Sequence, residues 1–219
     1  TWRDQSYMPY IIEGTISVYG VSSPVLTVEP GVEMRFKQNT GLYIGGYLAT
    51  DPPGALSAVG TPSNPIKFTK DATATSWYGI NFRNTSIDSG CLIDNAIVEY
   101  GNPNIFLSYA SPTIRNSIIR NSAGYGIHCY YSDPLIEGNI IENNALHGIY
   151  AYSCLLPAIK GNEVRFSASN PPNDYGVYFY GHTLATIQNN PRIDHNIYFT
   201  SANPSGNPTI SGNVFNNYS

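Results

Sequence analysis

The sequence predicts an all-β protein in which short strands stack in parallel as a solenoid. First, "PTIRNSIIRNSAGYGIHCY" at residues 112–130 returns as "PLIEGNIIENNALHGIYAY" at residues 134–152. Second, each copy alternates apolar and polar residues with period two, which indicates strands rather than helices. Third, a unit of about 22 residues made of short strands has no room for a crossover helix, so its copies must stack in parallel.

The repeat aligns on the motif Ile-x-Gly/Asn, as in "TIRNSIIRN" (113–121) and "LIEGNIIEN" (135–143). Each unit reads as strand, turn, strand. The isoleucines that begin the motif are Ile93, Ile114, Ile136, Ile159, Ile187 and Ile210, with spacings of 21, 22, 23, 28 and 23 residues. We expect them to lie directly above one another inside the solenoid.

Two columns of turn residues follow these isoleucines. Only Gly and Asn adopt positive φ at low cost, so the first column should be left-handed. It consists of Asn95, Asn116, Gly138, Gly161, Asn189 and Gly212. Asn side chains that stack along the axis can hydrogen-bond to one another as an asparagine ladder. The second column consists of Ala96, Ser117, Asn139, Asn162, Asn190 and Asn213.

With these repeats the chain resembles the right-handed parallel β-helix proteins, the pectate-lyase-like superfamily of solenoids, in their secreted or cell-surface bacterial or archaeal type. The resemblance is clear over residues 79–217 and looser over residues 25–78. It implies a single-stranded right-handed parallel β-helix, one domain over residues 1–219, with about nine or ten coils of roughly 22 residues. Residues 1–24 are expected as an N-terminal cap or first coil, and residues 51–57 as a loop.

Two outward columns of charged residues change sign from one coil to the next. Equivalent residues of neighbouring coils lie about 4.8 Å apart, where like charges repel, so the alternation predicts ladders of ion pairs between coils. The first column is Asp94, Arg115, Glu137, Lys160 and the neutral Gln188, and the second is Glu99, Arg120, Glu142, Arg165 and Asp194.

Composition narrows the function classes. The net charge is −4 without a basic stripe, which argues against nucleic acid as a partner. No apolar run is long enough to span a membrane, and no signal peptide precedes Thr1, as expected of a mature or excised piece. The three cysteines are an odd number and are expected to be structural. No cofactor is predicted.

A search for catalytic residues gives few candidates. By the resemblance, hydrolases of this fold use clustered Asp residues with Gly-His and Arg-Ile-Lys motifs. Here "GHT" (181–183) and "RID" (192–194) match these only in part. The catalytic candidates are therefore His182, Asp174 and Arg192. Lyases of the fold hold Ca²⁺ with several acidic residues, but the sequence has no acidic cluster and no histidine spacing for zinc, so no metal site is predicted.

The third strand of each coil carries an outward aromatic surface, which we call the tyrosine face. It consists of Tyr130, Tyr150, Tyr152, Tyr178, Tyr180, Tyr198, Phe106 and His128. Aromatic residues favour strands and stack on cross-strand neighbours, so one interpretation is purely structural. Another is a ligand surface, because Tyr offers a ring face to the C–H side of a sugar and a hydroxyl to its polar edge. A protein contact is the third.

These observations favour an extracellular or cell-surface, non-catalytic module that binds a polysaccharide or cell-surface glycan through the tyrosine face, or that serves as a surface or adhesion element. The alternative is a β-helix polysaccharide lyase, glycoside hydrolase or epimerase. A homo-oligomer formed through the coil ends or the tyrosine face, and a spacer without any ligand, are further hypotheses.

Overall fold

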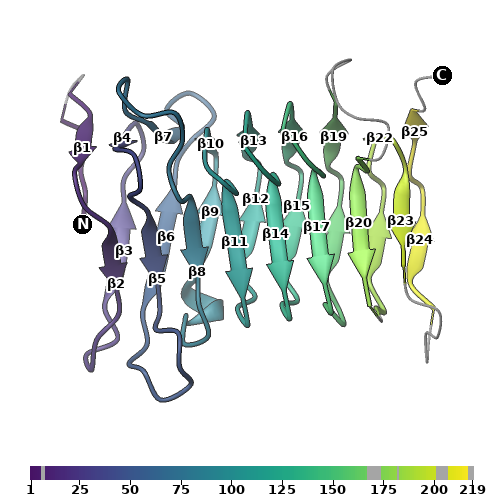
Figure 1. The fold of residues 1–219 in the computed structure, drawn as a ribbon, viewed down its shortest axis with the longest axis horizontal. Helices are drawn as coiled ribbons and strands as arrows, with labels where there is room; N and C mark the ends of the chain where they lie inside the picture. Colours follow the sequence, from purple (N-terminus) through teal and green to yellow (C-terminus); the bar gives the residue numbers. More distant parts are fainter. Residues whose placement is uncertain (6–7, 167–173, 182, 201–206, 217–219) are drawn as a thin grey trace.

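The computed structural model shows an all-β parallel solenoid, which confirms the predicted fold class (Figure 1). Each coil contributes one strand to each of three parallel sheets. Within the residues described, the only helical element is the 3-10 turn η1 (Asp88–Gly90). The structure describes residues 1–5, 8–166, 174–181, 183–200 and 207–216.

Every third strand in chain order belongs to the same sheet. Sheet 1 runs in the spatial order β1 (Tyr10–Ile12), β4 (Glu33–Phe36), β7 (Ile66–Lys70), β10 (Ala96–Glu99), β13 (Ile118–Arg120), β16 (Ile140–Glu142), β19 (Glu163–Arg165), β22 (Arg192–Asp194) and β25 (Phe215–Asn216). Sheet 2 runs in the order β2 (Ile16–Val18), β5 (Leu42–Ile44), β8 (Ile80–Phe82), β11 (Ile105–Ser108), β14 (Ile127–Tyr130), β17 (Ile149–Tyr152), β20 (Val177–Tyr180) and β23 (Ile197–Phe199). Sheet 3 runs in the order β3 (Val25–Val28), β6 (Ala55–Val59), β9 (Leu92–Asp94), β12 (Thr113–Arg115), β15 (Leu135–Glu137), β18 (Ala158–Lys160), β21 (Thr186–Gln188) and β24 (Thr209–Ser211).

The solenoid has fewer coils than predicted. Sheet 1 has nine strands and sheets 2 and 3 have eight each in the described part of the chain, which corresponds to about eight coils of about 24 residues rather than nine or ten of 22. The coils are longer because some connections carry insertions. One is the protruding segment 45–54 between β5 and β6.

The repeat isoleucines stack in register as predicted, but Ile210 in the last described coil is 44 % exposed rather than inside the solenoid. Ile114 of β12 pairs with Ile93 on one side and with Ile136 on the other, and the same register continues through Ile159 and Ile187. These five side chains are at most 1 % exposed. The column therefore forms a continuous apolar core along the solenoid axis.

The turn residues next to this column adopt the predicted left-handed conformation. Their φ angles are 50° at Asn95, 49° at Asn116, 64° at Gly138, 63° at Gly161, 54° at Asn189 and 66° at Gly212. The turn points the following residue back into the solenoid. This brings the second turn column into the interior, where its polar side chains need hydrogen-bond partners.

The asparagine ladder supplies those partners. Asn162 is fully buried, and its Oδ1 accepts hydrogen bonds from the backbone N–H of Asn139 at 2.9 Å and from its side-chain amide at 3.0 Å. Asn162 in turn donates its backbone N–H to Asn190 Oδ1 at 2.8 Å, and Asn190 donates to Asn213 in the same way. Ser117 begins the ladder by donating its N–H to Asn139 Oδ1.

The first charge column lies in register, but its ion pairs are incomplete. Arg115 Nε lies 2.8 Å from Asp94 Oδ2, as predicted. Glu137 and Lys160 are register partners, yet no ion pair joins these two described residues. The predicted ladder is thus formed at one step of this column.

The second charge column forms two of its predicted pairs. Arg120 Nε lies 2.8 Å from Glu99 Oε2, and Arg165 Nη1 lies 3.3 Å from Glu142 Oε2. Asp194, however, pairs with Arg192 of its own strand at 2.8 Å. A charged side chain here can pair with a residue one coil away or with a residue two positions away on the same strand. Both partners lie close enough for an ion pair.

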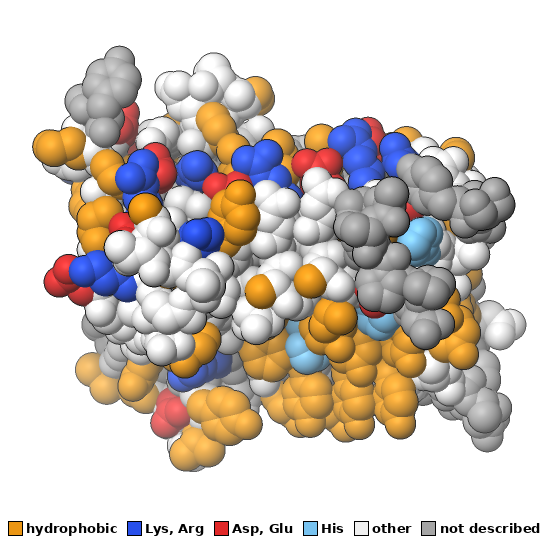
Figure 2. Space-filling model, turned by 45° about the horizontal axis from the view of Figure 1, so that its top comes forward, with side chains coloured by type: hydrophobic (Ala, Val, Ile, Leu, Met, Phe, Trp, Pro, Cys, Tyr) orange, Lys and Arg blue, Asp and Glu red, His pale blue; other side chains and the backbone are white. Residues whose placement is uncertain are grey.

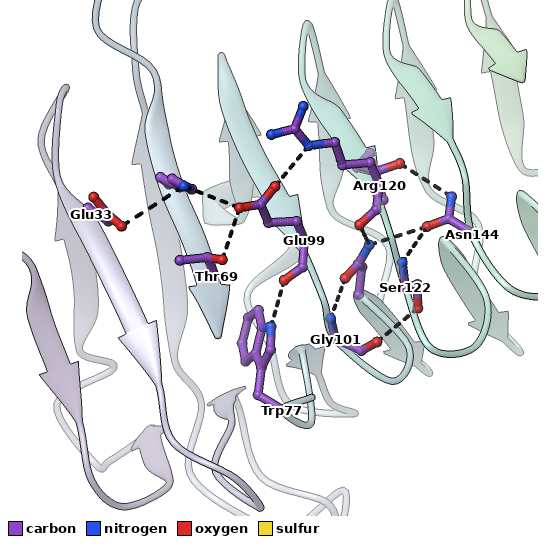
Figure 3. Close-up of polar contacts among 11 residues, drawn as sticks. Glu33, Thr69, Trp77, Glu99, Gly101, Arg120, Ser122 and Asn144 are labelled. Carbon is purple, nitrogen blue, oxygen red and sulfur yellow. Dashed lines mark hydrogen bonds and ion pairs between the residues drawn. The ribbon is translucent and has the colours of Figure 1, made fainter. Parts of the chain in front are cut away.

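Glu99 lies at the centre of a buried polar network (Figure 3). Its carboxylate accepts hydrogen bonds from Arg120 and from Thr69 Oγ1 at 2.9 Å, and it lies 3.2 Å from Lys67 Nζ. Burial raises the pKa of Glu99, but the bonds from Arg120 and Thr69 and the charge of Lys67 outweigh it and hold the pKa below its usual value. This carboxylate is therefore a structural charge.

In the N-terminal part, the structure corrects one boundary that was predicted from the sequence. Strands β1 and β2 pair with β4 and β5 and form the first coil. The loop expected at residues 51–57 is wrong in its bounds, because Ala55–Val59 is β6 and pairs in register with β3. Alternation within "ALSAV" buries Leu56 and Ala58 and leaves Ser57 and Val59 more exposed, as expected of a strand.

The three cysteines Cys91, Cys129 and Cys154 are free and buried. Burial raises the pKa of the Cys91 thiol to about 11. They pack as small apolar side chains, in agreement with the structural role expected from the sequence.

Replacing Asn162 by Ala should lower the free energy of unfolding by about 2–4 kcal/mol, because the buried N–H of Asn139 loses its acceptor and the carbonyl of Ile136 loses its donor. Urea unfolding followed by circular dichroism measures the loss. The control is Asn216→Ala, since Asn216 is an exposed asparagine of β25 and its replacement should cost less than about 0.5 kcal/mol. Equal effects of the two substitutions would contradict a stabilising ladder.

Candidate functional site

Sheet 2 carries a broad aromatic surface. Figure 2 shows hydrophobic side chains gathered over β14, β17 and β20, away from the charged groups along the upper edge of the view. The structure brings all eight residues of the tyrosine face together in two rows that cross the strands. Row 1 is Phe106, His128, Tyr150, Tyr178 and Tyr198, and row 2 is Tyr130, Tyr152 and Tyr180.

The rings of row 2 stack on one another along the solenoid axis. The centroids of Tyr130 and Tyr152 are 5.2 Å apart with an interplanar angle of 21°. Those of Tyr152 and Tyr180 are 5.0 Å apart with an angle of 6°. Ring faces are therefore turned toward neighbouring coils, while ring edges and hydroxyls point toward solvent.

This geometry differs from the surface of open ring faces expected from the sequence. Parallel strands lie about 4.8 Å apart, and tyrosines at that spacing cover each other's faces. An open face remains where a stack ends. In row 2 this is Tyr180, whose neighbour in the next coil is Thr200 and whose exposed fraction is 47 %.

A third row, which the sequence reasoning missed, completes the surface. Row 3 consists of Tyr125, His147 and Tyr175, each placed two residues before a strand of sheet 2. Its signal in the sequence is the pattern Tyr-Gly-Ile at 125–127, His-Gly-Ile at 147–149 and Tyr-Gly-Val at 175–177. The glycine is required by the stacking, because a Cβ on Gly126 would lie 2.6 Å from the carbonyl oxygen of Gly148 in the next coil.

Each ring of row 3 stacks on the row 1 ring of the following coil. Tyr125 lies 4.8 Å from Tyr150 with an interplanar angle of 12°. His147 stacks on Tyr178 at 4.6 Å, and Tyr175 stacks on Tyr198 at 4.5 Å. The rows thus interlock between coils, which fixes the orientation of each ring.

Two further tyrosines extend row 2 beyond the strand ends. Tyr109 and Tyr131 stack at 5.1 Å with an interplanar angle of 3°, and they are 51 % and 43 % exposed. Both have positive φ, 54° and 48°, a conformation that costs a non-glycine residue about 1–2 kcal/mol. The next coils place Ser153 and Gly181 at this position instead.

The fold and this surface can now be compared with known proteins. The sequence profile of the family described as "Right handed beta helix region" matches residues 66–215, which is more than half of the chain. The chain belongs to this right-handed β-helix family. No curated protein and no solved structure matches it. The family gives the fold of the chain, and the matched range covers the whole tyrosine face.

Two histidines of this β-helix are embedded in the aromatic rows. Burial lowers the pKa of both His128 and His147 to about 4, so both rings are neutral at pH 7. His147 Nδ1 accepts the backbone N–H of Tyr175 at 3.1 Å, which places the proton of the neutral ring on Nε2.

The catalytic candidates are only partly brought together. Asp174 is buried, and its Oδ1 lies 3.6 Å from Nδ1 of His147 rather than beside a second carboxyl group. Arg192 lies on sheet 1, where it pairs with Asp194. His182 lies outside the described residues. No pair of carboxyl groups suited to glycoside hydrolysis emerges from the candidates that the structure describes.

Among the described residues, no group of three or more His, Cys, Asp or Glu side chains could hold a metal ion. No helix in the described part is long and apolar enough to cross a membrane.

The stability of the β-helix should fall in acid because of His128 and His147. Their pKa of about 4 in the folded state lies below the value of about 6.5 expected in the unfolded chain. Between these values the unfolded chain binds more protons, so the contribution is present above pH 6.5 and is lost as the pH falls toward 4. We expect a loss of about 1–3 kcal/mol per histidine, measured by urea unfolding at several pH values.

The variant His128→Phe keeps an aromatic ring beside Phe106 and removes the titrating group. Its unfolding free energy should depend less steeply on pH between 6.5 and 4 than that of the unmodified chain. An unchanged slope would contradict the assignment, because other acidic groups contribute equally to both proteins.

Proposed function

We propose that this β-helix is an extracellular or cell-surface, non-catalytic module that binds carbohydrate through the tyrosine face. The observation that carries the proposal is the continuous outward aromatic surface of rows 1, 2 and 3, in which rings repeat at 4.5–5.4 Å over successive coils. A contiguous exposed aromatic surface of this kind is typical of an interaction site.

The chemistry of the surface suits a sugar. Tyrosine hydroxyls both donate and accept hydrogen bonds, as sugar hydroxyls do, and the ring edges between them supply apolar contact. The open face of Tyr180 at the end of row 2 can pack against the C–H side of one sugar ring. The interlocked stacks hold the hydroxyls in place, so little conformational entropy is lost on binding.

The purely structural interpretation of the rows does not account for the two tyrosines outside the strands. Tyr109 and Tyr131 are about half exposed, and the turn position that they occupy has positive φ in the following coils as well, at Ser153 and Gly181. Their positions enlarge the aromatic surface at its outer rim, which supports a contact with a ligand.

The double variant Tyr152→Ala, Tyr180→Ala should lose carbohydrate binding on a glycan array that includes neutral and acidic polysaccharides. It removes two successive rings of row 2, one of them the open end ring. The stacking energy lost is about 1–2 kcal/mol, so the variant should still fold, with a lower melting temperature.

The matched control is Tyr19→Ala, because Tyr19 is 46 % exposed and lies after β2 in the first coil, outside the tyrosine face. It should bind as the unmodified chain does. An array with no binding at all, or a double variant that binds normally, would overturn the proposed function.

A further inference from the structure

The tyrosine face is electrically neutral, which restricts its ligand. Rows 1, 2 and 3 contain no Lys, Arg, Asp or Glu. The two histidines in them are uncharged at pH 7, since burial holds their pKa at about 4. Burial also raises the pKa of Tyr125 and Tyr150, so these phenols keep their protons and remain donors.

The charged groups around the face would not attract an anion. Arg83 stands in the column of row 2, two coils before Tyr130, but its guanidinium lies over the ring of Tyr43 at 3.9 Å. Asp133 is exposed two residues beyond Tyr131, and Asp174 is buried beside His147. Among the described residues, the exposed charge nearest the tyrosine rows is thus the carboxylate of Asp133, which repels an acidic polymer, while the cation of Arg83 lies two coils before Tyr130.

The remaining arginines and lysines of the C-terminal half lie on the other two sheets. Arg120, Arg165 and Arg192 are on sheet 1, where each has a carboxylate partner, and Arg115 and Lys160 are on sheet 3. In Figure 2 many of the charged groups follow the upper edge, apart from the large hydrophobic surface at the lower right of the centre. Charged and aromatic residues of the C-terminal half are therefore separated onto different sheets.

Rows 1 and 2 run along the solenoid axis, and a ligand that contacts several rings of a row must run in the same direction. Row 2 runs across the strands, with successive centroids 5.2 and 5.0 Å apart, and row 1 continues from Tyr150 to Tyr178 and Tyr198 at 5.3 and 5.4 Å. A fully extended chain of equatorially linked pyranoses advances by about 5 Å per sugar, close to the spacing of about 4.8 Å between parallel strands. Successive sugars of such a chain are turned by about half a turn, so one sugar lies beside each coil and equivalent hydroxyls recur at every second phenol.

We propose that the tyrosine face takes an uncharged, extended polysaccharide that lies parallel to the solenoid axis with one sugar per coil. This inference rests on the proposed function and adds to it the charge, the shape and the orientation of the ligand. Row 1 and row 2 are two residues apart on each strand, which separates the rows by about 7 Å. The two rows can therefore contact opposite edges of one chain of sugars.

The test is isothermal titration calorimetry with three neutral series, cello-, manno- and chito-oligosaccharides of increasing length, and with oligogalacturonates of matched length. At least one neutral series should bind, with affinity rising until the chain spans the coils of Tyr130, Tyr152 and Tyr180 and then levelling off. Oligogalacturonates should bind at least about tenfold more weakly. The affinity of the neutral series should be insensitive to salt, since no ion pair is involved.

The variant Tyr152→Phe, Tyr180→Phe separates hydroxyls from rings. It keeps both stacked rings and removes two phenol hydroxyls, and we expect about tenfold weaker binding of the neutral chain, equivalent to about 1.4 kcal/mol. Tyr19→Phe is the control and should bind normally.

The outcomes are distinguishable. Tighter, salt-dependent binding of oligogalacturonates would overturn this inference and leave the proposed function standing. Unchanged affinity of the Phe variant would overturn the alignment of hydroxyls with sugars. If neither neutral nor acidic chains bind, both the inference and the proposed function are wrong.

Discussion

Parallel stacking of successive coils is the constraint on which the rest of this structure depends. Strands about 4.8 Å apart place each residue directly over its equivalent in the next coil, so a residue type repeated along the sequence becomes a column in space. The interior must then accept polar turn residues as well as isoleucines. The buried asparagines solve this by bonding to the backbone and the side chain of the next rung, as Asn139, Asn162 and Asn190 do. An isolated asparagine in the same place would be destabilising.

The same constraint turns a sequence repeat into a continuous aromatic surface. Tyr130, Tyr152 and Tyr180 lie far apart in the sequence, but stacking turns them into one row with a spacing set by the backbone. The backbone, and not the side chains, sets that spacing. Any ligand that matches it must be periodic itself, or must contact the open ring at the end of the row. This link from backbone geometry to ligand periodicity is what connects the fold to the proposed carbohydrate binding.

Much of the fold was predictable from the sequence, because an alignment of the repeats shows which residues stack above one another in successive coils. The isoleucine register, the positive φ at Asn116 and Gly138 and the asparagine ladder all follow from residue type and period. Ion pairs were less predictable, because Asp194 can pair either with Arg165 one coil away or with Arg192 on its own strand, and it pairs with Arg192. The composition of the tyrosine face was predictable, but its ring orientation was not, since stacking angles depend on side-chain torsions. Row 3 was missed because Tyr125 precedes its strand, where alternation does not apply.

The most direct test of the account is a disulfide between coils. Glu137 and Lys160 are register partners on the outer surface of sheet 3, and Cα atoms about 4.8 Å apart lie within the range that a disulfide can bridge. The variant Glu137→Cys, Lys160→Cys should form this bond under mild oxidation, as shown by mass spectrometry of proteolytic fragments. Glu137→Cys with Gln188→Cys, two coils apart, should not. Cross-linking of the second pair, or failure of the first in a folded protein, would contradict the stacking register.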